Sequence, residues 1–281
     1  MRLTIFIFIA LTVLSCHHKP KKTIGSESQF YTDSIYSAAL SEYRSHNIYL
    51  PNDFDVNKHY QIMYATDGSK NIDKGLLKKT LDSLIENKII EPFIFVASHA
   101  NNKIADSTST TMGNGEKVYL QFRNFEYIDM QPDSIENPSL ANRYQNHMLY
   151  FKNEFITHIE KEFKQELTKN DRYFYGVSNG AGFGMSLLNN YPDIIGTYIS
   201  LSTFGGDIQT NNWQQGVAYP RLYLQYGSEE PMFLKDDANF LKEKFKQLSQ
   251  FSEIKQYTGG HDYKKWNEIF IDLISKLLTV Q

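Results

Sequence analysis

The sequence lacks several features that would place it in a specialised class of protein. Only one of its 281 residues is cysteine, which excludes a disulfide framework and a zinc site built from thiolates. The 29 basic residues are balanced by 32 acidic ones, a net charge of −3, and there is no long basic run, so we expect no nucleic-acid partner. No apolar stretch reaches the ~20 residues that a helix needs to cross a bilayer.

What the sequence does contain is typical of a globular protein. Hydrophobic residues make up 41% and aromatic residues 14% of the chain, which excludes disordered and polytopic membrane proteins. The length fits one large α/β domain or two small ones, and either buries a core that needs no metal or disulfide. We see no internal repeat and no second domain boundary, and we expect no cofactor and no metal.

The N-terminal residues resemble a bacterial lipoprotein signal. Arg2 supplies a positive start, Leu3 to Leu14 is free of charge, and Ser15 and Cys16 follow directly before a polar, basic segment. About twelve apolar residues are too few to span a membrane but suit the core of a signal peptide. We expect residues 1–15 to be removed and Cys16 to be lipidated; a buried strand or an ordinary cleaved signal is the alternative.

The rest of the chain divides into a linker and one domain. Residues 16–30, rich in Lys, Pro, Gly and Ser, are expected to be a flexible tether, and residues 31–281 the folded domain. A lipid anchor implies a location in the bacterial cell envelope facing the periplasm, with the outer-membrane surface as the alternative. The membrane would then be a partner through the lipid.

Hydrophobic periodicity predicts alternating strands and helices. In the first half of the chain it indicates a hairpin at 36–51, a strand at 60–65, a helix at 72–87 and a strand at 92–97. Residues 99–145 show no pattern, which is typical of a lid or binding segment and sometimes of disorder. The second half indicates helices at 147–167, 180–190, 231–251 and 262–278, and strands at 173–175, 194–200, 221–226 and 253–257. This alternation predicts a mostly parallel sheet flanked by helices.

One motif carries the chemistry. Gly176 to Gly180 fits G-x-S-x-G between an aromatic strand and a helix rich in small residues. A serine on such an elbow occupies strained backbone, and side chains two residues away on either side would collide with the neighbouring turn. Ser178 is therefore the candidate nucleophile, and an ordinary glycine-rich turn is the alternative.

A serine nucleophile needs a base, and the base needs an acid. His261 lies in Gly-Gly-His-Asp between the last strand and the last helix, and all seven other histidines precede the serine. The acid should follow the strand at 221–226, where Glu229 and Glu230 are adjacent. Sequence pattern does not choose between these two carboxylates.

Together these segments resemble the putative-esterase family of α/β-hydrolases, which includes enterochelin esterase, feruloyl and acetyl-xylan esterases and S-formylglutathione hydrolase. The resemblance covers about residues 35–278 and implies a single α/β-hydrolase domain. Its most specific parts are the serine elbow and G-G-H-D-x-x-x-W, which ends at Trp266. The other matching segments are 37–40, 44–51, 64–68, 123–127 and 227–231.

The resemblance also implies roles for further residues. Its G-x-x-E pattern puts the acid at Glu230, with Glu229 second. It implies an oxyanion hole formed by the backbone amides of Asn179 and of Gly68 or Ser69. The family's active-site segments also suggest four side chains that contact substrate, with a surface ion pair as the alternative for the middle two: Asp67, Arg123, Glu126 and Trp266.

We therefore expect a lipid-tethered serine esterase in which Ser178 attacks an ester carbonyl and His261 relays the proton through an acyl-enzyme. The 19 tyrosines and 19 phenylalanines, with the long polar segment, favour aromatic or carbohydrate esters over long acyl chains, and the resemblance to enterochelin esterase adds siderophore esters. Two alternatives stay open: a non-catalytic protein that binds a ligand in the same cleft, and an acyltransferase that passes the acyl group to a sugar.

Overall fold

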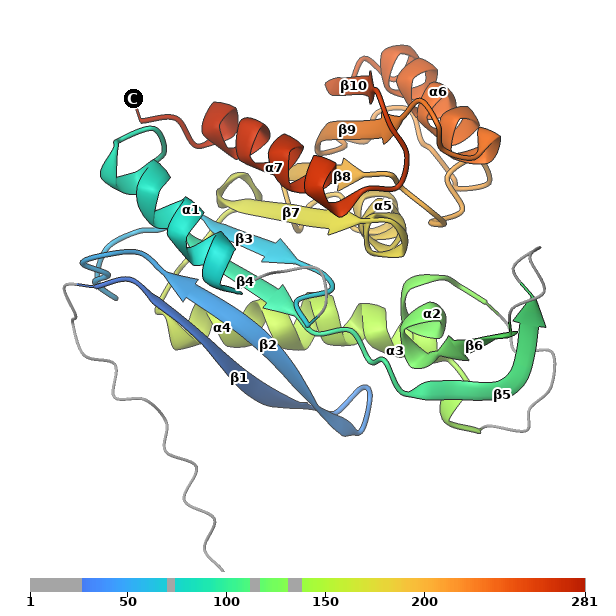
Figure 1. The fold of residues 1–281 in the computed structure, drawn as a ribbon, viewed down its shortest axis with the longest axis horizontal. Coiled ribbons are helices and arrows are strands. Elements are labelled where there is room, and N and C mark those ends of the chain that lie inside the picture. The colour runs from blue at the N-terminus through green and yellow to red at the C-terminus, as the bar shows by residue number, and fades with distance from the viewer. Residues whose placement is uncertain (1–26, 70–73, 112–116, 131–137, 281) are drawn as a thin grey trace, which may run out of the picture.

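The computed structural model describes residues 27–69, 74–111, 117–130 and 138–280. Its centre is an eight-stranded sheet with the strand order β1-β2-β4-β3-β7-β8-β9-β10 (Figure 1). The strands of this sheet are β1 (Gln29–Ser37), β2 (Glu42–Leu50), β3 (Ile62–Ala65), β4 (Ile94–Ser98), β7 (Arg172–Val177), β8 (Thr197–Leu201), β9 (Arg221–Gly227) and β10 (Ser252–Tyr257).

The sheet is mostly parallel, as the sequence predicts. β1 pairs with β2 and β2 with β4 in antiparallel register, and every later pairing from β4 to β10 is parallel. The central strands β3 and β4 are buried along their whole length, which is why both read as continuous apolar runs. Because parallel strands end at the same edge, the loops after β3, β7, β8, β9 and β10 gather along one side of the sheet.

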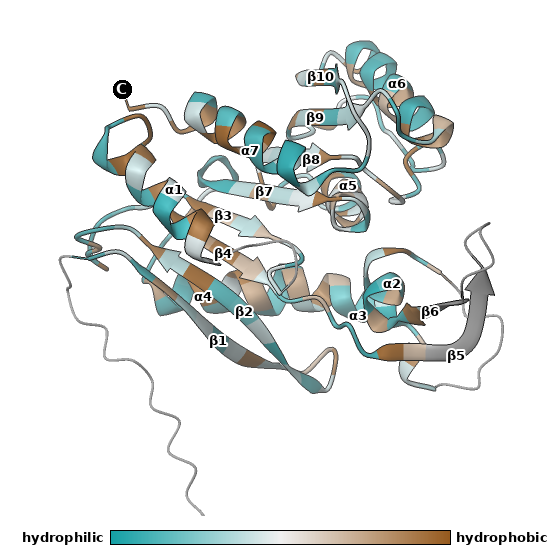
Figure 2. Ribbon diagram, viewed as in Figure 1, coloured by the Kyte–Doolittle hydropathy of each residue, from teal (hydrophilic) through white to brown (hydrophobic). Residues whose placement is uncertain are grey.

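Helices cover both faces of the sheet (Figure 1). They are α1 (Lys74–Glu86), α3 (Arg143–Leu149), the π-helix η2 (Tyr150–Phe155), α4 (Ile156–Glu162), α5 (Asn179–Asn190), α6 (Met232–Gln247) and α7 (Tyr263–Leu277). Figure 2 shows hydrophobic and hydrophilic residues alternating along α1, α6 and α7, as expected for helices with one buried face. Side chains of neighbouring strand residues enter two separate cores, as Tyr64 and Met63 do. This three-layer arrangement in one domain confirms the predicted fold class.

The segment 99–145 is more regular than its composition indicates. It contains the hairpin of β5 (Ile104–Thr111) and β6 (Lys117–Gln121), then α2 (Phe122–Tyr127), so the expectation of a patternless loop was wrong for these residues. The hairpin forms a two-stranded sheet outside the main sheet (Figure 1), and Ala105 and Leu120 at its base join a small apolar cluster with Phe125 and Leu140. Residues 112–116 and 131–137 lie outside the described part of the chain, and the role of the segment as a lid stays a prediction.

The N-terminal predictions fall largely on residues that the structure does not describe. The signal peptide at 1–15, the lipidated Cys16 and most of the tether lie outside the described residues. β1 begins at Gln29, inside the segment 16–30 that was expected to be a tether. None of the helices in the described residues is long and apolar enough to cross a membrane.

Candidate active site

Ser178 lies on a sharp turn between β7 and α5. Its backbone has φ 53° and ψ −128°, a region that costs a residue with a side chain on the order of 1–3 kcal/mol. Ser178 N donates to Leu201 O at 2.9 Å, and Ser178 O accepts from Gly182 N at 3.0 Å, so main-chain bonds from two elements hold the turn. A Cβ on Gly176 would lie 2.7 Å from Gly180 O, and one on Gly180 would overlap Thr66 Oγ1. Both glycines are therefore required for this geometry.

The structure brings His261 and Glu230 together. His261 lies two residues before the start of α7, and Glu230 lies in the loop after β9. The distance from His261 Nδ1 to Glu230 Oε1 is 3.4 Å. The Glu230 side chain is fully buried, whereas Glu229 is exposed. Burial opposes ionisation of Glu230, but hydrogen bonds from His261, Ser202 and Tyr257 outweigh it and hold the pKa of Glu230 below its ordinary value. The geometry favours Glu230 over Glu229 as the partner of the imidazole.

Three buried side chains hold this pair, and sequence reasoning missed two of them, Tyr257 and Ser202. The Tyr257 hydroxyl lies 3.2 Å from Glu230 Oε1 and 2.9 Å from Gly260 O. The indole N–H of Trp266 reaches Ser202 Oγ at 2.8 Å and the Tyr257 hydroxyl at 3.0 Å. The sequence does show Tyr257 at the end of the last strand, close before His261, but contains no signal for the role of Ser202.

Trp266 was expected to contact substrate, and its burial contradicts this. Only 1% of its surface is exposed, and its ring packs edge-on against His261 with centroids 4.6 Å apart. Its place in the motif is explained by this support of the imidazole rather than by a substrate contact.

The loop after β3 contains Gly68 and Ser69, one of which was expected to supply an oxyanion donor. The N–H of Gly68 donates to Ser98 O at 2.9 Å, and Gly68 O accepts from Asn47 Nδ2 at 2.6 Å. Of the two candidates in this loop, Gly68 is thus already engaged, which leaves the amide of Ser69. Asn179 is the first residue of α5, where main-chain N–H groups have no partner within the helix.

Asp67 and Arg123, also expected to contact substrate, bind each other. Arg123 Nε and Nη2 donate to the two carboxylate oxygens of Asp67 at 2.6 and 2.7 Å, and Nη1 donates to Asn179 Oδ1 at 2.9 Å. Asp67 is 1% exposed. The burial of Asp67 contradicts a substrate contact for this carboxylate, whereas the substrate contact of the partly exposed Arg123 stays a prediction.

Glu126 is likewise buried away from substrate. Its side chain is fully buried, and Oε1 accepts from Arg44 Nη1 at 2.7 Å and from Arg143 Nε at 3.1 Å. Glu42 bonds both arginines from the other side. Neither the substrate contact nor the surface ion pair considered for Glu126 is correct, because its carboxylate is buried between Arg44 and Arg143, two arginines that the partly exposed Glu42 also binds.

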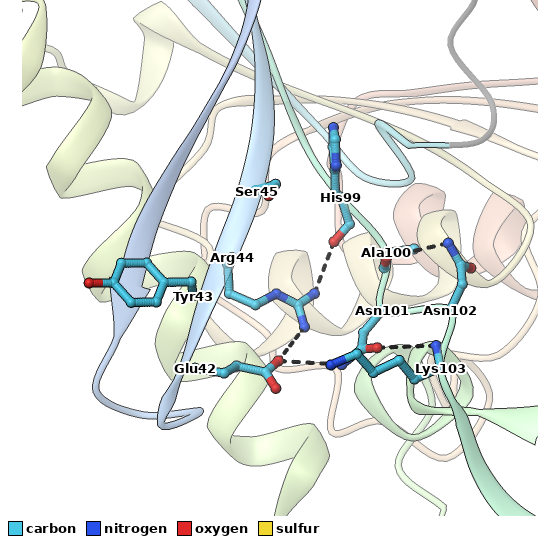
Figure 3. Close-up of a pocket in the computed structure, with 9 residues that line it drawn as sticks. All are labelled: Glu42, Tyr43, Arg44, Ser45, His99, Ala100, Asn101, Asn102 and Lys103. Carbon is cyan, nitrogen blue, oxygen red and sulfur yellow. Dashed lines mark hydrogen bonds and ion pairs between the residues drawn. The ribbon is translucent and has the colours of Figure 1, made fainter. Parts of the chain in front are cut away.

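A polar pocket of about 610 Å³ opens between β2 and the segment after β4. Figure 3 shows Arg44 pointing towards Glu42 and the His99 backbone, with Asn101, Asn102 and Lys103 on the facing segment. Ser178 does not line this pocket. Asn102 Nδ2, however, lies 3.4 Å from Ser69 Oγ, so the pocket adjoins the loop with the expected oxyanion donor.

The elbow and the Glu230–His261 pair are linked through the loop after β8. Phe204 N donates to Ser178 O at 3.1 Å, and Ser202 of the same loop lies 3.0 Å from the Tyr257 hydroxyl. In the described part of the chain no hydrogen bond joins the Ser178 hydroxyl to His261, whose side chain is 43% exposed. Catalytic hydrogen bonds are often long without substrate and shorten when it binds. No group of three or more His, Cys, Asp or Glu side chains among the described residues could hold a metal ion.

Comparisons with known proteins identify the family of the chain and agree with its fold. The model of the family described as "Putative esterase" matches residues 37–277, whereas no curated protein matches the chain. Three solved structures share the fold at low identity. A ferulic acid esterase from the fungus Anaeromyces mucronatus is 16% identical with a TM-score of 0.61, covering 90% of each chain. An S-formylglutathione hydrolase from Agrobacterium tumefaciens is 12% identical with a TM-score of 0.64, and the match covers 90% of this chain and 97% of that chain.

The third structure is the enterobactin esterase of Shigella flexneri, which is 17% identical with a TM-score of 0.62. The match covers 89% of this chain and 59% of that chain. At such identities the structural likeness concerns the fold, which is the α/β-hydrolase fold, whereas the family match extends over most of the sequence. The chain belongs to the putative-esterase family, and it is a serine esterase with the α/β-hydrolase fold.

Proposed function

We propose that this esterase hydrolyses carboxylic esters with a Ser178–His261–Glu230 triad. The observation that carries the proposal is the placement of a strained serine elbow after β7 and a buried carboxylate paired with an imidazole after β9 and β10. These loops lie at one edge of the sheet, where parallel α/β folds bind their ligands. The acid and base come from neighbouring parallel strands.

The reaction proceeds through an acyl-enzyme. His261 accepts the proton of the Ser178 hydroxyl while Oγ forms a bond to the ester carbonyl carbon, and the carbonyl electrons move to oxygen. The bond to the leaving alkoxide then breaks, and His261 returns the proton to it. Water repeats the sequence to release the acid and restore Ser178. Glu230 stays ionised, orients the imidazole through Nδ1 and stabilises its charged form.

Two main-chain amides are suited to stabilise the oxyanion. The Asn179 amide stands beside the nucleophile at the start of α5, and the Ser69 amide follows the engaged Gly68. Donors that already point towards the developing charge stabilise the transition state and not the ground state. Removal of one such donor costs about 3 kcal/mol of transition-state stabilisation.

The surroundings of the site support an ester with one aromatic and one polar part. Phe204, Phe233 and Tyr263 follow members of the site closely in the chain and are exposed, and the first two pack with ring centroids 5.4 Å apart. The pocket beside Ser69 is lined with amide and charged side chains, which suit hydroxyl-rich groups better than an acyl chain. We propose aromatic, carbohydrate or siderophore esters as substrates; ferulic acid and enterobactin are named for two of the similar structures.

The proposed location follows from the N-terminal sequence alone. Cys16 behind an apolar segment would carry a lipid that holds the domain in the cell envelope, facing the periplasm. Membrane-fraction mass spectrometry of the mature N-terminus tests this, and a chain that starts at any residue other than a lipidated Cys16 contradicts it.

A substrate panel tests the reaction. Aryl, acetyl-sugar, feruloyl and catecholate-siderophore esters are offered to the wild type and to Ser178→Ala, with and without a sugar acceptor. We expect hydrolysis that Ser178→Ala abolishes. Turnover that survives in Ser178→Ala would overturn the triad, binding without turnover would indicate a ligand-binding protein, and acylated sugar as the main product would indicate an acyltransferase.

A further inference from the structure

Arg123 connects two loops that are 112 residues apart in sequence. Asp67 follows β3 in the loop of the proposed oxyanion donor, and Asn179 follows the nucleophile. The guanidinium donates two hydrogen bonds to the Asp67 carboxylate, at 2.6 and 2.7 Å, and a third to Asn179 Oδ1 at 2.9 Å. One side chain is thus bonded to both loops whose amides would stabilise the oxyanion.

The guanidinium is held mainly by contacts within the protein. Its side chain is 16% exposed and that of Asp67 2%, and its face lies over the Tyr127 ring, 4.9 Å from the centroid. The Tyr127 hydroxyl in turn accepts from Asp67 N at 3.3 Å. A bidentate arginine–carboxylate pair fixes direction as well as distance, so Arg123 and Tyr127 together hold Asp67 through both its side chain and its backbone.

Both ends of this connection have strained backbone. Asp67 has φ 59° and Ser178 has φ 53°, and neither is glycine. Such conformations persist only where surrounding contacts determine them. The two loops also touch directly, since a Cβ on Gly180 would lie 2.9 Å from Asp67 Oδ2. Arg123 contacts Asp67 itself and Asn179, the residue directly after Ser178. These contacts stabilise the strained backbone at both positions.

The helix that carries Arg123 is itself fixed. Arg123 N donates to Asn101 O at 2.8 Å, and Glu126, on the next turn of α2, is buried between Arg44 and Arg143. Within the R-x-x-E-Y segment, Glu126 therefore anchors the helix, Tyr127 packs under the guanidinium, and Arg123 reaches the site. The spacing of the motif has a structural cause for each of its three residues.

From this geometry we infer that Arg123 is a positioning residue, which holds the Asp67–Ser69 loop and the Ser178 elbow in register so that the two proposed oxyanion donors face one point. The inference rests on the proposed function. Losing the connection should impair the transition state more than ground-state binding, because the donors act on charge that develops during the reaction.

The matched control is Arg172, which forms a similar pair far from the loops. Arg172 Nε and Nη2 donate to Glu160 at 2.5 and 2.9 Å, and its side chain is 17% exposed. It starts β7, whereas Ser178 follows the end of this strand. Arg123→Ala, Arg123→Lys and Arg172→Ala are compared by kcat and KM on p-nitrophenyl acetate, by the Kd of phenylboronic acid, and by hydrogen exchange of the amides at 66–69 and 178–180.

We expect Arg123→Ala to lower kcat about 10²-fold and to raise the Kd of phenylboronic acid by a similar factor. KM should stay within about threefold of the wild-type value. Millimolar guanidinium should restore part of the loss. Arg123→Lys, which keeps the charge but has no planar fork, should fold and lose about tenfold. Arg172→Ala should lower the melting temperature and keep kcat within about twofold.

Two results overturn the inference. The first is an equal decrease of kcat in Arg123→Ala and Arg172→Ala. The second is an increase of KM in Arg123→Ala with unchanged kcat and unchanged Kd of phenylboronic acid, which would make Arg123 a substrate ligand. Failure of the proposed function looks different, because the wild type itself would then show no turnover dependent on Ser178. Hydrogen exchange still decides the positioning role in that case. Exchange at 66–69 must be faster in Arg123→Ala than in Arg172→Ala, and equal exchange refutes the role.

Discussion

Replacing one carboxylate by an amide should distinguish the two adjacent glutamates. Glu230→Gln removes the charge 3.4 Å from His261 Nδ1 while keeping nearly the same shape. Glu229→Gln makes the same chemical change one residue earlier, on an exposed side chain. The pair of variants therefore separates the role of the triad acid from general effects of lost negative charge at this loop.

The size of the effect follows from the geometry. Two unit charges 3.4 Å apart attract by about 5 kcal/mol at an effective dielectric constant of about 20. Because 43% of the His261 side chain is exposed, solvent screens this attraction, and we take roughly 3 kcal/mol as the loss when the imidazolium forms in the transition state. This corresponds to about a 10²-fold decrease in kcat.

The assay is steady-state hydrolysis of p-nitrophenyl acetate at pH 8, with circular dichroism melting to verify the fold of each variant. We expect kcat to fall about 10²-fold in Glu230→Gln and to stay within about twofold in Glu229→Gln. Wild-type kcat in a folded Glu230→Gln, or an equal loss in both variants, would refute the assignment of Glu230.

Three further predictions concern the surroundings of the triad and the core. Tyr257→Phe removes the hydroxyl bonded to Glu230 and Gly260, so kcat should fall severalfold and the unfolding free energy by about 1 kcal/mol in urea titrations; unchanged values of both contradict the network. Gly180→Ala forces a Cβ against Thr66 and Asp67 and should cost about 1–3 kcal/mol of stability together with most ester turnover, and an unaffected variant would contradict the elbow geometry. Burial lowers the pKa of His46 from 6.5 to about 4, so the unfolded chain binds a proton between these values that the folded chain does not. Stability from this group is complete above pH 6.5 and is lost as the pH falls towards 4, by about 3 kcal/mol; urea titrations of His46→Leu should lack this slope, and an unaltered slope would refute it.

The parts of the site that follow from local rules could be predicted from the sequence. The elbow at Ser178 depends on glycines two residues away, and His261 depends on chain order and on its place between a strand and a helix. Both patterns can be read from a few neighbouring residues because the contacts that require them are made within the turn itself or between adjacent elements. The same applies to the parallel sheet, whose buried strands are continuous apolar runs.

Contacts between distant segments left no such signal. The residue pattern did not choose between Glu229 and Glu230, and only the family's G-x-x-E pattern favoured Glu230, whose burial beside Tyr257 is a contact with another strand. The pairing of Arg123 with Asp67 joins segments 56 residues apart. Glu126 was expected near substrate because the R-x-x-E-Y segment of the family lies near the active site, yet its carboxylate is buried between two arginines from distant segments. The β5–β6 hairpin was missed because β5 is a run of small polar residues after Ala105, and its only strand partner in the described residues, β6, lies with it in a separate two-stranded sheet.

The central claim is that Ser178 is the nucleophile activated by His261. The most direct test is intact-mass analysis after reaction with a fluorophosphonate probe, applied to the wild type, Ser178→Ala and His261→Ala. The account predicts one adduct on Ser178 of the wild type, none on Ser178→Ala, and labelling of His261→Ala that is slower by orders of magnitude. Equal labelling of the wild type and Ser178→Ala would contradict it.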